Sequence, residues 1–318
     1  MKETTRIFIV GGGAIGFSLA AHLKAAGRDV TVLRVSGNAP EEATQTIAVR
    51  SGEGDILEQE VVSRPLSSQG EIDGLVVLAT KANVNDYLAE VLSRSAHSTD
   101  LLVMQNGIGV ERPFLGKGFS SLSRCVVYIT AEKVGDGSYT ARMVKPSPIG
   151  SVGAADDRSA EIAGRLSTET LAFYREDDID REIWKKGIIN TVFNSVCPLL
   201  DIDNGIFDRD DTVMGLAREI VMECVPVASR LGVAVSAEEI LDQIVMISRR
   251  SKGQLISTLQ DIRANRDTEI AYFNLEICRV GGETEPPIDL PLTRMLGLLT
   301  LKKAEIAKER AKIGEKAH

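Results

Sequence analysis

The chain has 318 residues, of which 43% are hydrophobic and 26% charged, a composition typical of a soluble protein with room for two domains. Its formal net charge of -8 argues against a nucleic-acid or anionic-membrane partner, because both are negatively charged themselves. A small anionic ligand stays compatible with this charge, since a few local cations suffice to bind it.

The sequence predicts neither a secretory signal nor a membrane-spanning segment. Glu3 lies among the first residues, and the apolar run from Ile7 ends at Gly11. No uninterrupted apolar segment approaches the roughly 20 residues that cross a bilayer. The cysteines lack the spacing of metal ligands or redox pairs and are expected to be small buried side chains: Cys125, Cys197, Cys224 and Cys278. We therefore expect a cytoplasmic protein without a metal site.

The first part of the chain alternates between strand-length apolar runs and helical segments. Strands are predicted at 6–10, 30–34, 75–80, 101–104 and 125–130, and helices near 15–26 and 84–93. Because these runs lack strict alternation, we expect strands buried on both faces of a parallel sheet. An edge hairpin at 138–144, a helix near 158–166 and a strand near 171–174 would complete a doubly wound, Rossmann-like α/β domain over residues 1–175.

Helical periodicity prevails in the remainder, which we expect to form an all-helical domain over residues 176–318. The predicted helices cover 183–200, 213–231, 237–248, 268–281 and 292–313. Ser236 followed by Glu239 is the signature of a capping box at the start of one of them.

Gly11, Gly13 and Gly16 form a G-x-G-x-x-G pattern between the first predicted strand and the first helix. In this context the pattern indicates a dinucleotide site, with the helix amino terminus facing the phosphates. An NAD enzyme usually carries an acid at the end of its second strand, whereas this chain has Arg34 there. A guanidinium favours a 2′-phosphate, so NADP is preferred over NAD.

Two further strand ends carry polar residues, and carboxyl ends of parallel strands open on the ligand crevice. Lys81 follows one strand and could contact phosphate or ribose. Asn106 follows another and could contact substrate or the nicotinamide ribose, with Gly107 allowing a sharp turn. Each of them could equally be an ordinary loop residue.

The segment 182–198 is apolar around most of a helix, yet Lys186, Asn190 and Asn194 recur along one stripe of it. Since buried cations and amides need partners, we interpret the stripe as facing a polar ligand. The alternative is a helix with one solvent-exposed edge, along which Lys186 extends into water. A hydride acceptor also needs a proton donor, and His22, His97 and His318 are not placed for that role. The donor is therefore expected to be a lysine, a tyrosine or a carboxyl group, which makes Lys186 one candidate.

Two other segments are ambiguous from their residues alone. The run 201–205 begins like a calcium loop, but its glycine comes one place early and Thr212 stands where a glutamate is required, so Asn204 is assigned to a turn. The block 257–270 is densely charged and would by itself predict a solvated helix–loop–helix.

Together these segments resemble the ketopantoate reductase (2-dehydropantoate 2-reductase) family over essentially the whole chain. The glycine fingerprint, Arg34, Thr80-Lys81-Ala82 and Gln105-Asn106-Gly107 contribute to the resemblance. Its more specific part is Trp184-Lys185-Lys186 with Asn190 and Asn194, combined with Ser257, Gln260-Asp261, Arg266 and Thr268-Glu269-Ile270.

The resemblance implies NADPH-dependent reduction of a 2-oxo acid to a 2-hydroxy acid. The leading substrate is ketopantoate, whose reduction belongs to pantothenate and coenzyme A biosynthesis. Lys186 would be the proton donor, and Glu269 the family's essential acid, near Lys186, substrate and nicotinamide. The two domains would hold the reacting carbons at hydride distance across the cleft between them. The implied substrate contacts are Asn106, Asn190, Asn194, Asn204 and Ser257. The implied cofactor contacts are Gly11, Gly12, Gly13, Ala14, Ile15, Gly16, Arg34, Lys81, Asn106 and Glu269.

The chain also departs from the family pattern. After Thr-Glu-Ile the family commonly continues Asp-Tyr-Ile-Asn-Gly, whereas this chain has Ala271 and Leu275 at the first and last of these positions. The reaction type is unaffected, but a different branched 2-oxo acid stays open as the substrate. A non-catalytic NADP-binding sensor is the alternative from another class, and a homodimer is also left open.

Overall fold

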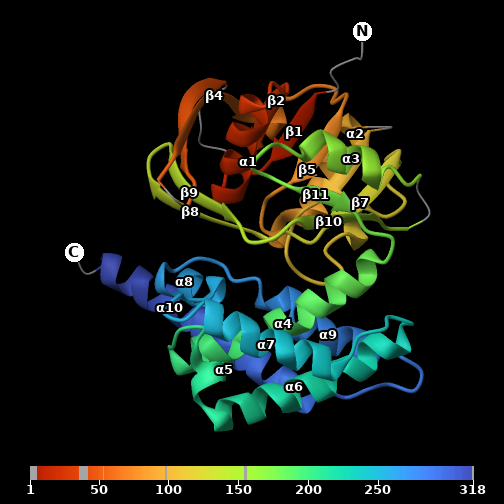
Figure 1. Ribbon diagram of the computed structural model, residues 1–318, viewed down its shortest axis with the longest axis vertical. Helices are drawn as coiled ribbons and strands as arrows, with labels where there is room; N and C mark the ends of the chain where they lie inside the picture. The colour runs from red at the N-terminus through yellow and green to blue at the C-terminus, as the bar shows by residue number, and fades with distance from the viewer. Residues whose placement is uncertain (1–5, 36–41, 53, 97–98, 154–155, 317–318) are drawn as a thin grey trace. The chain divides into compact units, whose positions relative to one another are not determined.

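The computed structural model describes residues 6–35, 42–52, 54–96, 99–153 and 156–316 (Figure 1). The chain divides into two compact units, one formed by 1–106 with 110–179 and the other by 107–109 with 180–318. The division into two compact units does not test where the domains begin and end, so the domain boundary expected after residue 175 stays a prediction. The assignment of the short segment 107–109 to the second unit was not expected from the sequence.

The first unit is built on one large sheet. Within the described residues, its strands follow the spatial order β11-β10-β7-β6-β5-β1-β2-β4-β3-β9-β8. The six neighbours from β7 to β4 are mutually parallel. Their bounds are β1 Ile7–Val10, β2 Val30–Arg34, β4 Ile56–Pro65, β5 Leu75–Leu78, β6 Asp100–Val103 and β7 Ser121–Cys125. This confirms the doubly wound α/β prediction, and β1, β5 and β6 are buried along their whole length, as their apolar runs indicated.

The outer strands are mixed in direction. β3 (Ala43–Arg50) pairs antiparallel with β4 and parallel with β9 (Ser138–Met143), and β8 (Ile129–Gly135) forms the edge hairpin with β9. On the other side, β10 (Ser147–Ser151) pairs antiparallel with β7 and parallel with β11 (Phe173–Arg175). The hairpin expected at 138–144 therefore exists, with β8 as its first strand.

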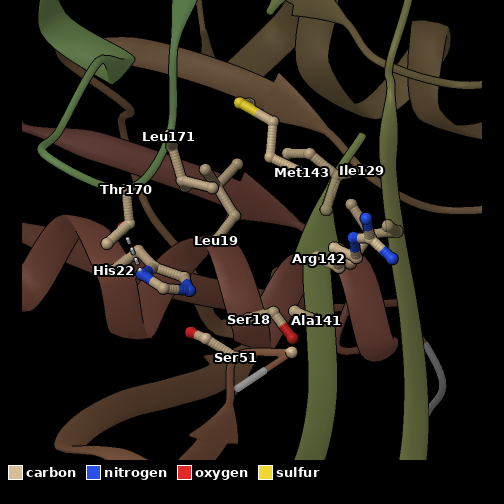
Figure 2. Close-up of a pocket in the computed structure, with 12 residues that line it drawn as sticks. Ser18, Leu19, His22, Ser51, Ile129, Ala141, Arg142, Met143, Thr170 and Leu171 are labelled. Atoms are coloured by element: carbon tan, nitrogen blue, oxygen red, sulfur yellow. Dashed lines mark hydrogen bonds between the residues drawn. The ribbon is translucent and has the colours of Figure 1, made fainter. Parts of the chain in front are cut away.

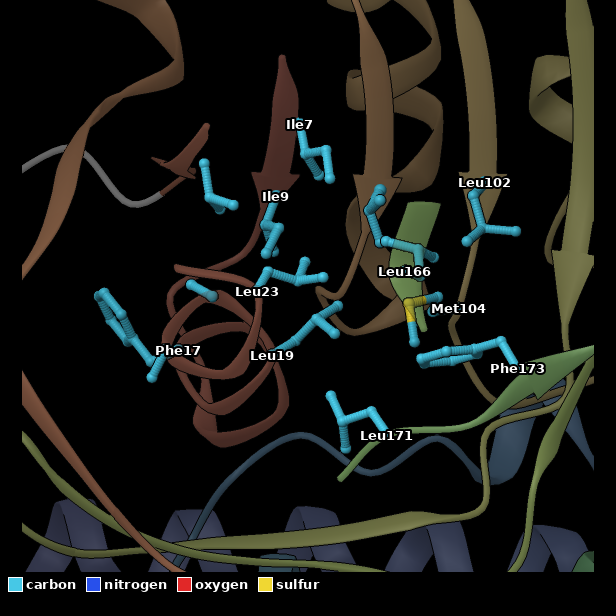
Figure 3. Packing of buried hydrophobic residues seen from close by; sticks show 14 of the residues in the cluster. Ile7, Ile9, Phe17, Leu19, Leu23, Leu102, Met104, Leu166, Leu171 and Phe173 are labelled. Carbon is cyan, nitrogen blue, oxygen red and sulfur yellow. The ribbon is translucent and has the colours of Figure 1, made fainter. Parts of the chain in front are cut away.

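Helix α1 (Ala14–Ala25) is enclosed by this sheet. It contacts β1, β2, β3, β4, β8 and β9, and every residue from Gly16 to Leu23 is buried. Figure 3 shows Leu23 of this helix beside Ile9 of β1, with Phe17 and Leu19 on other sides of the helix; all four belong to one buried cluster. Each such side chain contributes about 1.5–3 kcal/mol by leaving water. Helices α2 (Asn85–Ser95) and α3 (Ser159–Leu166) complete the unit.

Several predicted boundaries are wrong. The strand expected at 125–130 is the junction between β7 and β8, because a continuous apolar run does not reveal where the chain changes direction. Strands β3, β4 and β10 were not predicted; β3 and β4 are partly exposed and contain many polar residues. The strand expected at 171–174 begins two residues later, as β11, after a turn in which Thr168 N donates to Leu171 O.

The second unit is helical, as expected. Its helices are α4 (Ile179–Leu200), α5 (Ile206–Arg209), α6 (Asp211–Arg230), α7 (Ala237–Arg250), α8 (Ser257–Arg263), α9 (Asn274–Gly282) and α10 (Pro291–Lys316). The helix predicted at 268–281 is broken at Phe273, which separates a short 3₁₀ turn at Ile270–Tyr272 from α9. None of the helices that the structure describes is long and apolar enough to span a bilayer.

The capping box at Ser236 is only half formed. The Ser236 hydroxyl accepts a hydrogen bond from Glu239 N, as predicted, at 3.4 Å. The Glu239 side chain instead forms ion pairs with Arg181 and Lys185 of α4. A residue expected to cap its own helix therefore joins α7 to α4.

Candidate functional site

The glycine turn between β1 and α1 has the geometry that a pyrophosphate site requires. Gly11 has φ +123°, and a Cβ there would lie 2.8 Å from the Ala79 carbonyl carbon. A Cβ on Gly16 would lie 2.0 Å from Gly11 O, so the helix packs directly on the turn. At Gly13, the residue before α1, no atom of the described residues beyond its chain neighbours lies within 4 Å of the corresponding position. The backbone is thus open to a ligand where the helix begins.

Arg34 lies next to this turn. It is the last residue of β2, and a Cβ on Gly12 would lie 3.5 Å from Arg34 Cγ. Gly11 N also donates to Leu33 O at 2.8 Å, which ties the turn to the end of β2. The predicted phosphate turn and the predicted 2′-phosphate residue are therefore neighbours within the first unit.

A buried amide pair holds the ends of β5 and β6 together. Gln105 and Asn85 exchange reciprocal side-chain hydrogen bonds of 2.7 and 2.8 Å. The same Gln105 Nε2 lies 2.8 Å from Thr80 Oγ1, and Asn85 Nδ2 donates to Val110 O. This network fixes the backbone that carries Lys81 and Asn106. The sequence did not single out Asn85, and its position at the start of α2 gave no signal of this role.

In the second unit, α4 carries the predicted polar stripe on a buried helix. Ile188, Val192 and Val196 have at most 1% of their surface exposed. Lys186 and Asn190 are half-buried, and Asn194 is 2% exposed. The three side chains follow one another at four-residue spacing on this helix.

The neighbouring lysine has a different environment. Lys185 is buried and forms ion pairs with Glu182 and Glu239, within α4 and with α7 respectively. The two carboxylates compensate the buried charge of Lys185 and link α4 to α7. This supports the choice of Lys186 over Lys185 as the candidate donor.

Asn194 connects the stripe to the block that begins at residue 257. Its Oδ1 accepts hydrogen bonds from Thr258 Oγ1 at 2.8 Å and Ser257 Oγ at 3.3 Å. Ser257 is exposed, whereas Thr258 is buried. Thr258 is therefore the buried residue that orients the Asn194 amide. The sequence did not identify it.

Asn204 has a buried side-chain acceptor, Oδ1, to which no described residue donates. Its Oδ1 accepts no hydrogen bond from any residue that the structure describes, although the residue is only 7% exposed. The backbone is held firmly: Asn204 N donates to Gln254 O at 2.9 Å, and Asn204 O accepts from Ser248 Oγ at 2.7 Å. Gln254 lies three residues before Ser257, so Asn204 belongs to the same region as Asn194 and Ser257.

The segment 107–109 brings α4 together with the turn that carries Glu269. Ile108 N donates to Tyr272 O at 3.0 Å. A Cβ on Gly187 would lie 2.6 Å from Ile108 Cδ1, so Ile108 packs directly on α4 beside Lys186. Glu269 itself is half-buried and immediately precedes the 3₁₀ turn at Ile270–Tyr272. Gly187 was not expected to have a role, and only this contact reveals it.

Comparison with known proteins places these features in a family. Residues 7–152 match the family model "Ketopantoate reductase PanE/ApbA", and residues 178–303 match the model of its C-terminal domain. The chain belongs to the ketopantoate reductase family. This confirms the resemblance and makes the protein an oxidoreductase of the 2-dehydropantoate 2-reductase type.

The relatives of this ketopantoate reductase homologue are distant but cover it almost completely. The 2-dehydropantoate 2-reductase of Streptococcus pyogenes serotype M6 is 25% identical, over 91% of this chain and 95% of its own. A D-mandelate dehydrogenase solved with NADH and anilino(oxo)acetate has a TM-score of 0.83 at 21% identity, covering 95% of this chain and 99% of that one. A dimeric ketopantoate reductase from Staphylococcus aureus has a TM-score of 0.78 at 20% identity, with 95% and 99% covered. Both structures share the fold.

The structure shows the surroundings of Leu275 and Ala271, the two residues that depart from the family pattern. Leu275 packs on α10, where a Cβ on Gly297 would lie 3.0 Å from its Cδ2. Ala271 is exposed on the 3₁₀ turn. The bulk of Leu275 is therefore accommodated by Gly297 within the second unit.

The histidines and cysteines considered from the sequence are not among these groups of residues. His22 is buried in the first unit and lies 2.8 Å from Thr170 Oγ1 through its Nδ1, while His97 and His318 lie outside the described residues. All four cysteines are buried and unpaired, as expected for this reductase. Burial raises the pKa of the Cys197 thiol to about 12, so it is inert as a nucleophile at neutral pH. No cluster of three or more His, Cys, Asp or Glu in the described part of the chain could hold a metal ion.

Proposed function

We propose that the protein reduces a 2-oxo acid to a 2-hydroxy acid with NADPH, and that ketopantoate is the leading substrate. The observation that carries this proposal is the polar stripe of α4 in a ketopantoate reductase homologue. A half-buried lysine and two asparagines lie along an otherwise apolar helix. The more buried asparagine, Asn194, is oriented by hydrogen bonds from Thr258 and Ser257.

The first unit fits a nicotinamide dinucleotide. The open backbone at Gly13 and the start of α1 suit a pyrophosphate, within the segment Gly11, Gly12, Gly13, Ala14, Ile15 and Gly16. Arg34, beside Gly12, would pair with a 2′-phosphate, which distinguishes NADP from NAD. Lys81 and Asn106 extend from the two strand ends that Gln105 and Asn85 hold in place.

The bound cofactor supplies a hydride to the 2-oxo carbon. The residues of this chain complete the reaction with a proton: Lys186 Nζ donates it to the carbonyl oxygen, which becomes the new hydroxyl group. An ammonium group at that position stabilises negative charge as it develops on the oxygen. The chemistry requires the reacting carbons to approach to about 3–3.5 Å.

The other polar residues would bind and orient the substrate. We assign Asn190, Asn194 and Asn106 to its polar groups and Ser257 to its carboxylate. Glu269 would be the acid close to substrate and nicotinamide. The unsatisfied Oδ1 of Asn204 needs a donor, and a substrate hydroxyl group is of the required kind.

Ketopantoate contains such a hydroxyl group, which favours it among branched 2-oxo acids. Reduction of a different 2-oxo acid is the second candidate, since Ala271 and Leu275 depart from the family pattern and a D-mandelate dehydrogenase shares the fold. The deciding experiment measures kcat/KM across a panel of 2-oxo acids, each with NADPH and with NADH. Selective turnover of ketopantoate with NADPH is expected. Tight NADPH binding without turnover of any panel member would instead support a non-catalytic sensor.

We also propose that the protein forms a homodimer, as its Staphylococcus aureus structural neighbour does. Light scattering after size-exclusion chromatography tests this directly, because the monomer mass is 34.3 kDa. The unpaired, buried cysteines favour a reducing compartment, and we assign the protein to the cytoplasm.

A further inference from the structure

A pocket of about 230 Å³ lies within the first unit, along the face of α1 that the β8–β9 hairpin covers. Its apolar wall includes Leu19, Ile129, Met143 and Leu171. Figure 2 shows His22 and Ser51 on one side of it and Arg142 on the other. Ile15 forms one end, seven residues and about 10 Å along the helix from His22.

The polar groups of this pocket are incompletely satisfied. Ser18 is 2% exposed, yet its hydroxyl makes no hydrogen bond to any residue that the structure describes. A buried hydroxyl group without a partner costs stability, and a bound polar group would recover that cost. His22 uses Nδ1 in its contact with Thr170 Oγ1, so only its second ring nitrogen can serve a ligand. Burial lowers the pKa of His22, which keeps the ring uncharged at neutral pH.

Charge and size restrict what the pocket can bind. Arg142 is exposed and is the only residue carrying a full charge among the described residues that line it, since no Asp or Glu is among them. A guanidinium at the mouth of an apolar pocket favours a carboxylate. The volume is below the ~300–1,000 Å³ typical of drug-sized ligands, and at about 30 Å³ per water it corresponds to about eight non-hydrogen atoms.

We propose that this pocket is a second ligand site, which binds a compact monocarboxylate with a branched aliphatic body and a hydroxyl group. Arg142 pairs with the carboxylate, the apolar wall covers the branched carbons, and Ser18 with His22 binds the hydroxyl group. The site shares only Ile15 with the predicted cofactor residues, and none of the predicted substrate residues lines it. It is therefore independent of the reaction proposed above.

Ligand-observed saturation-transfer NMR on the full chain tests the proposal, with 3-hydroxy-3-methylbutanoate as the probe. Its eight non-hydrogen atoms match the pocket, and it lacks the 2-oxo group that the reductase reaction needs. We expect saturable binding by the wild type. Arg142→Gln should weaken binding by about tenfold or more, because it removes a charged hydrogen-bond partner. Arg218→Gln makes the same charge change on the exposed surface of α6 and should leave binding unchanged.

Two further comparisons separate this site from the reductase site. Lys186→Ala should bind the probe like the wild type. Ser18→Ala should lose any preference for 3-hydroxy-3-methylbutanoate over 3-methylbutanoate, while its thermal stability should be equal or higher, because no described residue bonds to the hydroxyl that it removes. The proposal is overturned if the wild type does not bind the probe, if Arg142→Gln binds it normally, or if Lys186→Ala alone abolishes binding.

Discussion

Asn194 Oδ1 on α4 accepts a hydrogen bond from Thr258 Oγ1 on α8, across 2.8 Å in the interior of the second unit. Thr258 is 1% exposed, so water cannot replace it as the donor. The bond fixes which face of the Asn194 amide is presented along the polar stripe. It also links two segments of the family signature that are 64 residues apart.

Replacing Thr258 with Val keeps its shape and removes this donor. We expect KM for the 2-oxo acid to rise about tenfold and the free energy of unfolding to fall by about 1–2 kcal/mol, the loss of one buried hydrogen bond. Thr191→Val is the matched control, because Thr191 is a buried threonine on α4 whose hydroxyl donates to Gly187 O of the same helix. It should lose similar stability without a change in KM. Equal KM effects in both variants would contradict the positioning role of Thr258.

The adjacent lysines of α4 should have opposite phenotypes. Lys186→Ala should reduce kcat by about 10²–10⁴-fold with little loss of stability, as expected for removal of a general acid. Lys185→Ala leaves the buried Glu182 still paired with Arg181 at 3.6 Å but without its closer lysine partner, and should lose about 1.5–3 kcal/mol of stability, while folded enzyme keeps its kcat. Steady-state kinetics and urea denaturation of both variants measure this. A near-normal kcat for Lys186→Ala would exclude it as the donor.

Arg34 should determine the choice between the two nicotinamide cofactors. Arg34→Asp removes the cation beside the glycine turn and introduces a charge that repels a 2′-phosphate. We expect NADPH binding to weaken by about ten- to a hundredfold, and NADH binding far less. Cofactor fluorescence titrations give both dissociation constants. Equal losses for the two cofactors would mean that Arg34 does not contact the 2′-phosphate.

Gly187 is expected to be intolerant of a side chain. A Cβ at this position would lie 2.6 Å from Ile108 Cδ1, so Gly187→Ala must displace either Ile108 or α4. We expect a loss of about 1–3 kcal/mol, typical of overpacking, together with lower kcat because Lys186 is the preceding residue. In the double variant Gly187→Ala with Ile108→Ala, which removes both clashing atoms, Cδ1 and the Cγ1 at 2.7 Å, the two substitutions should cost less together than the sum of their separate costs. Additive effects in the double-mutant cycle would argue against the contact.

His22 should make the stability of the first unit dependent on pH. Burial lowers its pKa in the folded state below the ordinary value of about 6.5. Between the lowered pKa and about 6.5 the unfolded chain binds more protons, so acidification in this window favours unfolding. The contribution of uncharged His22 to the free energy of unfolding is therefore fully present above pH 6.5 and declines as the pH falls. Melting temperatures at pH 7 and pH 5 should differ less for His22→Gln than for the wild type.

The residues that could be predicted from the sequence are those whose signal is local. The glycine turn, the stripe of α4 and the apolar strands of the central sheet all follow from spacing along a few helical turns or one strand. The residues that could not be predicted act through partners far away in the chain. Thr258 matters because of Asn194, Gly187 because of Ile108, and Asn85 because of Gln105. None of these pairs has a periodicity that reveals it.

By itself, the sequence determined the fold class and the family, because helix and strand periods, glycine turns and short motifs are properties of consecutive residues. It also singled out Lys186 over Lys185 from their positions on one helix. Only the tertiary structure decided which polar groups are satisfied. Lys185 is neutralised by Glu182 and Glu239, whereas the side-chain Oδ1 of Asn204 and the Ser18 hydroxyl lack a partner among the described residues. Hydrogen-bond satisfaction depends on which distant segments pack together, and packing is set by the whole chain.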